Sequence, residues 1–291
     1  EEALAKKNAA LKKQIEEVND EVSTGKAQLL SGQFDSALKH FNAAEKALPT
    51  EEKDFCGSKL SEISGLLYDS STAQDDPNTI SELENTAVDY AEKALKYNEN
   101  QAIPHYVLGK KAIVDKNYTK AVDEFTKAVS NDSKNSLYYY ELGKVQYRLQ
   151  KYSSAKTSFA SSTKIDSSFE NAWYNLGLTY NKLGNTDEAI TSFRKALQAN
   201  SLYTKAYKEL GKALQNKGDY SGALDAYKSE LKLDTTDLYA LQNIGTIYTY
   251  QGNYDQAVIY YKKALSYSPG DIVTNYNLST ALYRNNKIDE A

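Results

Sequence analysis

The sequence predicts an all-α solenoid of antiparallel helix pairs, and two observations lead to it. Apolar residues recur at steps of three, four and seven, which is the spacing of a helix face and not of a strand. A pattern of small and large residues also returns every 34 positions along most of the chain. Because repeats of this length pack mainly on their neighbours, we expect the 291 residues to form one stack and not two domains.

The clearest repeat spans residues 170–203, and Gly184 separates its two helices. Steps of 34 residues give four registered series: Gly109, Gly143, Gly177, Gly211 and Gly245; Ala121, Ala155, Ala189, Ala223, Ala257 and Ala291; Phe125, Phe159, Phe193, Tyr227 and Tyr261; Leu108, Leu142, Leu176, Leu210, Ile244 and Leu278. Gly177 and Ala189 are small where the two helices must approach closely. A larger residue at either position should cost roughly 1–3 kcal/mol through overpacking.

Seven residues of this repeat match the tetratricopeptide (TPR) pattern: Trp173, Leu176, Gly177, Tyr180, Ala189, Phe193 and Ala196. The chain therefore resembles the TPR family over nearly its whole length. The resemblance implies a right-handed superhelix whose first helices line a concave face. The closing proline of the family stands only at Pro49 and Pro269, and serine or threonine replaces it elsewhere. Serine and threonine also end one helix and cap the next, so the predicted fold is unchanged.

The register divides the chain into an N-terminal helical extension, residues 1–17, and a TPR solenoid, residues 18–291. Its seven full repeats and partial eighth lie near residues 18–51, 52–101, 102–135, 136–169, 170–203, 204–237, 238–271 and 272–291. The first helix should run to residue 30 with about three heptads of apolar residues, and Asn8 falls on that seam. This stripe either caps the first repeat or forms a short coiled coil. Both ends of the sequence look cut, so we expect further chain on either side.

Repeat two is irregular, because residues 52–101 are 16 longer than the period of 34. We expect its first helix near residues 55–68 and a polar loop over residues 69–78, with Asp76 and Pro77 starting the next helix. Such an insertion is either tolerated surface or a binding element. In the regular repeats, Gly184, Gly218 and Gly252 should take the left-handed conformation, which Asn117 and Lys151 should take at some cost.

The composition and the missing motifs exclude several classes of function. The net charge of −4 gives no basic character for nucleic acid, and the single cysteine, Cys56, excludes an internal disulfide and a cysteine metal site. No apolar run approaches the ~20 residues of a membrane span. The only histidines are His40 and His105, and no ligand spacing, phosphate loop or nucleophile motif is present. We therefore predict a non-enzymatic chain without cofactor or metal. The sequence does not decide the compartment, which is either the cytoplasm or the bacterial cell envelope or periplasm.

The inward positions of the first helices, placed by the family resemblance, include eight lysines or arginines and no carboxylate. A wall of one charge sign attracts the opposite sign, and tyrosines add rigid contact area. The candidate peptide-binding residues are Tyr106, Lys110, Tyr140, Lys144, Tyr147, Arg148, Tyr174, Asn175, Lys182, Lys205, Lys208, Lys212, Asn243, Tyr276 and Asn277. They predict a protein or peptide partner with an acidic extended segment. The alternative is a solvated face that is simply rich in lysine and tyrosine.

Two binding patterns of the family are only partly present. Asn175 and Lys205 match two of the five residues that clamp chaperone tail carboxylates, which is too few for that function. Asn175, Asn243 and Asn277 match the asparagine ladder of the O-GlcNAc transferase repeats, but Glu141 and other residues interrupt it. The partial ladder implies generic peptide binding and brings no transferase activity with it.

Three functions remain open from the sequence. The first is a scaffold or adaptor that binds an acidic partner segment. The second is a structural module that self-assembles through the N-terminal heptads or the last repeat. The third is the recognition arm of a larger enzyme whose catalytic domain lies outside these residues.

Overall fold

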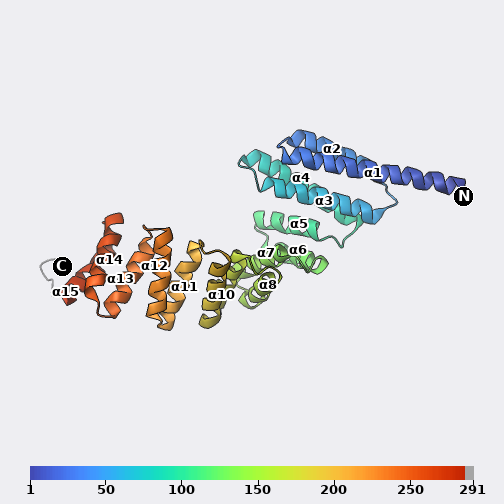
Figure 1. Ribbon diagram of the computed structural model, residues 1–291. Helices are drawn as coiled ribbons and strands as arrows, with labels where there is room; N and C mark the ends of the chain where they lie inside the picture. Colours follow the sequence, from blue (N-terminus) through green and yellow to red (C-terminus); the bar gives the residue numbers. More distant parts are fainter. Residues whose placement is uncertain (286–291) are drawn as a thin grey trace. The chain divides into compact units, whose positions relative to one another are not determined.

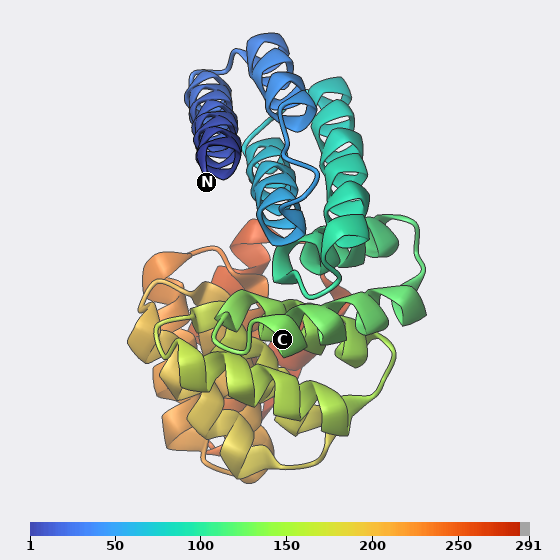
Figure 2. The same cartoon turned by 90° about the vertical axis from the view of Figure 1, so that its right-hand side faces the viewer.

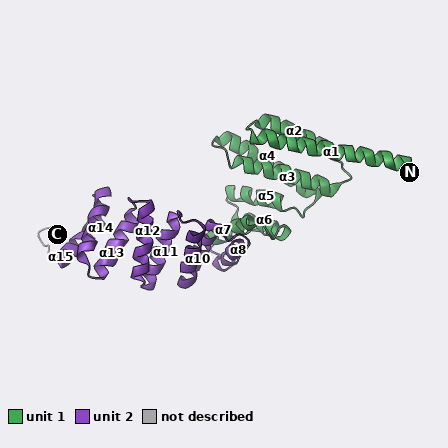
Figure 3. Ribbon diagram, viewed as in Figure 1, with its two compact units in different colours: residues 1–149 green, residues 150–291 purple. Residues whose placement is uncertain are grey.

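The computed structural model describes residues 1–285 and contains fifteen α-helices and no strand in that part of the chain (Figure 1). The predicted all-α solenoid of helix pairs is confirmed. The helices form two compact units, residues 1–149 and residues 150–291 (Figure 3). None of the described helices is both long enough and apolar enough to cross a membrane.

Unit 1 contains seven helices: α1 (Glu2–Leu30), α2 (Phe34–Lys46), α3 (Lys53–Ser71), α4 (Pro77–Tyr97), α5 (Ala102–Val114), α6 (Tyr118–Asn131) and α7 (Ser136–Arg148). Unit 2 contains eight: α8 (Tyr152–Ile165), α9 (Glu170–Lys182), α10 (Thr186–Ala199), α11 (Thr204–Lys217), α12 (Tyr220–Leu233), α13 (Leu238–Tyr250), α14 (Tyr254–Tyr267) and α15 (Ile272–Arg284). Each helix contacts the next one along the chain within its unit, except that α3 packs against α1 and not against α2. First helices of neighbouring repeats also touch, as α9 and α11 do.

The close approach predicted inside each helix pair is present. A Cβ atom added at Gly177 of α9 would lie 2.6 Å from Cε1 of Phe193 on α10, which is too close for any real contact. Ala189 and Phe193 are both fully buried. The same ring-on-glycine contact joins Gly109 to Phe125 in unit 1, where the added Cβ would lie 2.7 Å from the ring. The two units therefore share one packing scheme.

Repeat two carries its extra residues in longer helices and not in the expected polar loop. Helices α3 and α4 have 19 and 21 residues, whereas the regular helices have 13 or 14, and only residues 72–76 connect them. The expected loop over residues 69–78 is wrong because α3 continues to Ser71, which is buried and donates a hydrogen bond to the carbonyl of Tyr68. Asp76 does cap α4, accepting from the Thr79 amide at 2.8 Å, with Pro77 next to it.

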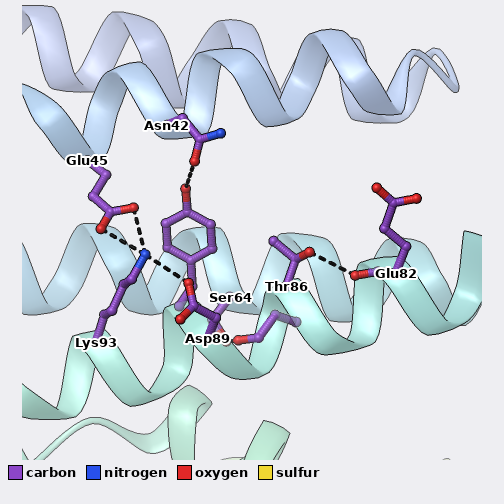
Figure 4. Close-up of polar contacts among 9 residues, drawn as sticks. Asn42, Glu45, Ser64, Glu82, Thr86, Asp89 and Lys93 are labelled. Atoms are coloured by element: carbon purple, nitrogen blue, oxygen red, sulfur yellow. Dashed lines mark hydrogen bonds and ion pairs between the residues drawn. The ribbon is translucent and has the colours of Figure 1, made fainter.

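Helices α1–α4 lie side by side (Figures 1 and 2), and polar contacts join repeat one to repeat two. Lys93 on α4 bridges Glu45 on α2 at 2.9 Å and Asp89 on its own helix at 2.8 Å (Figure 4). The Tyr90 hydroxyl donates to Asn42 of α2 at 3.1 Å. Since these donors and acceptors pair with one another, the contact is a structural one.

Helix α1 has a packed half and an exposed half. Val18 and Val22 are buried, so the C-terminal part serves as the first helix of repeat one. The first ten residues are exposed, Leu4 is 63% exposed, and Lys7 reaches Glu51 at 2.8 Å. The apolar stripe predicted for this helix is therefore covered only toward its C-terminal end.

Four glycines and two other residues end the first helices in a left-handed conformation. Gly184, Gly218 and Gly252 adopt it as predicted, but the equivalent residues in the earlier turns are Lys116 and Gln150, with φ of 58° and 60°. Asn117 and Lys151 were expected there and stand one residue later. Asn117 instead caps α6, because its side chain accepts a hydrogen bond from the Lys120 amide. A side chain at positive φ carries strain that glycine avoids.

Candidate protein-interaction face

In unit 1 the predicted cations lie against a buried carboxylate. Lys110 of α5 and Lys144 of α7 both donate to Glu141, at 3.3 and 3.1 Å. The Glu141 side chain is only 6% exposed. Lys144 also lies 5.1 Å from the ring centre of Tyr140. The predicted inward positions contain no carboxylate, but Glu141 is adjacent to them and neutralises two of their lysines.

The candidate tyrosine of α5 is part of the packing. Tyr106 contacts the rings of Tyr68, Phe125 and Tyr138, with ring centres 5.8, 6.0 and 5.2 Å away. Burial raises the pKa of Tyr106, and nearby Glu141 raises it further. At the end of α7 the Arg148 guanidinium lies 4.4 Å from the ring centre of Tyr118. Tyr147 is half-buried. Lys144 and Arg148 are exposed, but each already contacts neighbouring side chains in unit 1.

In unit 2 several predicted cations are exposed. Lys182, at the end of α9, and Lys205 and Lys212, on α11, are exposed and form no ion pair within residues 150–285. Glu209 stands where unit 1 has Glu141, yet Lys212 does not pair with it. Because α9 and α11 are in contact, these three exposed cations lie on neighbouring first helices. We call the exposed surface of α9, α11 and α13 the unit 2 first-helix face.

The fourth cation of this face, Lys208, is partly neutralised. Its Nζ lies 3.9 Å from Oδ2 of Asp237 and 4.3 Å from the ring centre of Tyr239. Next to α11, Tyr174 of α9 contacts Phe193 and Tyr203 with ring centres 6.0 and 5.2 Å away. Tyrosines therefore border the cations, although they are half-buried and not fully presented to solvent.

Two candidate asparagines share one geometry. The Asn175 side chain donates to the Asn171 carbonyl at 2.8 Å, and that of Asn243 donates to the Tyr239 carbonyl at 2.8 Å. Both bonds run back one turn along the same helix, so they fix the orientation of each amide. Asn277 on α15 is half-buried, and Tyr276 beside it is 72% exposed. Asn175 on α9 and Asn243 on α13 thus stand at matching places, and Glu209 occupies that place on α11 between them.

Other ionisable residues have structural partners. Both ring nitrogens of buried His105 face acceptors, Glu124 at 2.7 Å and the Glu99 carbonyl at 3.1 Å. The hydrogen bond from His105 lowers the pKa of Glu124. No group of three or more histidines, cysteines or carboxylates in residues 1–285 is placed to hold a metal ion. Sequence reasoning identified Glu141 only as a break in the asparagine ladder and missed Asp237 and Glu230. Glu230 interrupts the series of small residues at steps of 34 from Ala196.

Comparison with known proteins agrees with this geometry. The family model of the tetratricopeptide repeat matches residues 170–201 and 238–271. The predicted resemblance to the tetratricopeptide-repeat family is therefore supported by two of its repeats. A search of curated protein sequences found no match. Tetratricopeptide repeats generally serve as scaffolds for protein–protein interaction, and this chain has their helical solenoid fold.

Several solved structures share the TPR fold. One is YrrB, described as a TPR protein with an unusual peptide-binding site: it is 25% identical, covers 64% of this chain and 96% of its own length, and has a TM-score of 0.58. MamA is 26% identical, covers 56% of this chain and 95% of its own, and has a TM-score of 0.54. PilF of Pseudomonas aeruginosa, 17% identical over 76% of this chain and 99% of its own with a TM-score of 0.59, shows the fold alone.

Proposed function

We propose that this TPR protein is a scaffold that binds an extended acidic segment of a partner protein on the unit 2 first-helix face. The observation that carries the proposal is the exposure of Lys182, Lys205 and Lys212 without an ion-pair partner in unit 2. Lysines left unpaired in a protein of net charge −4 are available to a ligand of opposite sign. The chain itself acts without catalysis in this proposal.

The contact energy comes from the residues beside the lysines. Exposed cations mainly raise the association rate, and salt screens them. Tyr174 and Asn175 on α9 and Asn243 on α13 offer ring surface and amide groups to a peptide backbone. An extended peptide suits this face, because the two asparagines stand at matching positions on either side of α11. The peptide-binding site named for YrrB supports the same class of ligand for the fold.

A titration tests this proposal. An acetylated, fluorescent Asp-rich peptide is added to wild type and to the double variant Lys205→Glu, Lys212→Glu at low and moderate salt. We expect the variant to bind on the order of tenfold more weakly at low salt and to show a flatter salt dependence. Lys208 is left unchanged, because a carboxylate there would face Asp237 and disturb the fold.

The matched control makes the same change in net charge on second helices. Lys195 of α10 and Lys263 of α14 are exposed, and Lys195→Glu with Lys263→Glu should leave binding nearly unchanged. A second control replaces every Asp of the peptide by Asn, which should abolish the attraction. Equal binding by all three proteins would refute the proposal and leave a solvated lysine-rich face.

Self-association through α1 is a second candidate, and the 63% exposure of Leu4 favours it. Leu4 belongs to the apolar stripe that continues to buried Val18, so a second copy would cover its exposed end. Sedimentation of wild type and of Leu4→Lys tests this. A dimer that the substitution dissociates supports it, whereas a wild-type monomer at high concentration contradicts it.

A further inference from the structure

Glu230 occupies a position where the other regular repeats carry a small residue. Steps of 34 residues from it reach Ala128, Ser162, Ala196 and Ala264. Glu230 is only 3% exposed, and its Oε2 atom is buried without a hydrogen-bond partner in the described part of the chain. A buried carboxylate without a partner is unfavourable when it is ionised. This residue therefore calls for an explanation beyond packing.

The surroundings of Glu230 differ from the corresponding place one repeat earlier. In repeat five the aligned residues form an uncharged cluster: Asn171, Tyr174 and Tyr203. The Tyr203 hydroxyl donates to Asn171 at 2.8 Å, and its ring contacts Tyr174. In repeat six the counterparts are Lys205, Lys208 and Asp237. An uncharged cluster has thus become a charged one, and two of its members are lysines of the proposed binding face.

The charged groups around Glu230 come from three elements. Helix α11 contributes Lys208 and Glu209, the N-cap of α13 contributes Asp237, and the C-cap of α12 contributes Asp234. Burial is the main cause that raises the pKa of Glu230 to about 7, the three carboxylates raise it further, and Lys208 opposes them. Tyr227, one turn earlier on α12, donates its hydroxyl to Gln215 at 3.1 Å and not to Oε2 of Glu230.

We propose that Glu230 makes the binding of an acidic segment to the unit 2 first-helix face depend on pH, an inference that rests on the function proposed above. When Glu230 is ionised, its charge interacts with that of Lys208 and lowers the positive potential of the face. When it is protonated, that opposing charge is gone and the lysines attract the partner more strongly. Binding of an acidic partner in turn favours the protonated form, because linkage is reciprocal.

The test measures the affinity of the acetylated Asp-rich peptide between pH 6 and pH 8. The peptide carboxylates stay ionised over this range, because their ordinary pKa is about 4. For wild type we expect affinity to rise by about threefold or more from pH 8 to pH 6. Glu230→Gln has nearly the same shape without the charge, and it should bind at both pH values as tightly as wild type at pH 6.

Two features of the variants separate the effect of Glu230 from that of other titrating groups and from misfolding. Glu230→Gln keeps His40 and His105, so any pH dependence that comes from the histidines persists in the variant. Glu230→Ala introduces the residue found at the matching position of most other repeats, and it should show the same flat profile. Circular dichroism confirms that each variant is folded, and the alanine variant serves if the glutamine variant is not.

Each outcome has one meaning. A pH-dependent wild type with flat variants supports the proposal. Binding with the same pH dependence in all proteins overturns the role of Glu230 and leaves the acidic-segment function intact. No binding by any protein at either pH overturns the proposed function and this inference with it.

Discussion

Unit 1 and unit 2 share their helix-pair packing but treat charge in opposite ways. In unit 1, Glu141 accepts hydrogen bonds from Lys110 and Lys144, so a carboxylate that burial would destabilise is satisfied. In unit 2, Lys205 and Lys212 are exposed without an acidic partner in that unit. Oε2 of Glu230, by contrast, is buried without a hydrogen-bond donor. One repeat can therefore serve for stability and another for binding, depending on a few charged positions.

The comparison also explains why the backbone alone does not reveal the binding face. Both units bury a ring against a glycine of the preceding helix, and both carry lysines on their first helices. The difference arises from which residue faces those lysines. Leu178 stands on α9 where α5 has Lys110, so Glu209 lacks the pair of lysines that Glu141 has. Charge pairing, not helix position, separates the two faces.

The largest expected effect is on the free energy of unfolding, and it tests whether the two units share the same helix-pair packing. Ala121→Leu in unit 1 and Ala189→Leu in unit 2 each replace a fully buried residue at the helix contact. Both should lower the free energy of unfolding by roughly 1–3 kcal/mol through overpacking, and by similar amounts. Urea unfolding with local hydrogen exchange measures this. A large effect in only one unit would show that the packing is not equivalent.

Removing one buried carboxylate from each unit should shift stability in opposite directions. Glu141→Gln removes the negative charge that pairs with two lysines and should destabilise unit 1 by about 1–2 kcal/mol. Glu230→Gln removes a charge without a partner and should stabilise unit 2 by about 1 kcal/mol at pH 8. Denaturant midpoints at equal slope give both values. The same sign for both substitutions would contradict the account.

The pH dependence of stability should also have opposite directions in the two units. Glu124 has a lowered pKa, so the stability it gives is present above its ordinary value of 4.5 and is lost as pH falls through the folded value. Glu230 has a pKa raised to about 7, so stability is lost as pH rises from about 4.5 to 7. Hydrogen exchange, corrected for intrinsic rates, should show α12 and α13 better protected at pH 5 than at pH 8.

The controls for this pH experiment are single substitutions in each unit. Glu230→Gln should remove the change in α12 and α13, whereas Glu124→Gln should reduce protection of α5 and α6 at neutral pH, where the ionised carboxylate is paired with His105. Protection of α12 and α13 that stays constant from pH 5 to pH 8 in wild type would contradict the buried, unpaired state of Glu230.

The smallest expected effect on stability comes from the left-handed residues in the turns between paired helices. Lys116→Gly in unit 1 and Gln150→Gly in unit 2 relieve a side chain at positive φ. The left-handed conformation costs a non-glycine residue about 1–2 kcal/mol, and the greater freedom of glycine in the unfolded chain offsets part of this. We expect a gain of about 0.5–1 kcal/mol for each variant in thermal unfolding. Gly218→Ala, the reverse change, should be destabilising, and a neutral result there would argue against strain in these turns.

The sequence predicted the fold well because the 34-residue period fixes which small and large residues meet. The helices of the regular repeats, the glycine–ring contacts and the Asp76 cap all follow from local patterns. The polar stretch after residue 68 was assigned to a loop, since serine and aspartate disfavour helix, but burial of Ser71 extends α3. Tertiary packing overrode local propensity there.

The candidate site could be predicted only as a set of positions. The spacing places Lys144 and Lys212 at matching points of their repeats, but it does not show that one of them bonds to a buried carboxylate. That pairing depends on Lys110, which lies 31 residues before Glu141, and on side-chain direction. Glu230 was visible as a break in a series of small residues. Its missing hydrogen-bond partner became apparent only from the packed neighbours.

Mapping of amide chemical shifts with the Asp-rich peptide tests the central claim most directly. If the unit 2 first-helix face binds acidic segments, the shifts should change in α9 and α11 around Asn175 and Lys205, and should largely disappear in Lys205→Glu with Lys212→Glu. Helices α5 and α7 of unit 1 should change little, because their lysines are paired with Glu141. Changes centred on α5 and α7, or spread equally over first and second helices, would contradict the account.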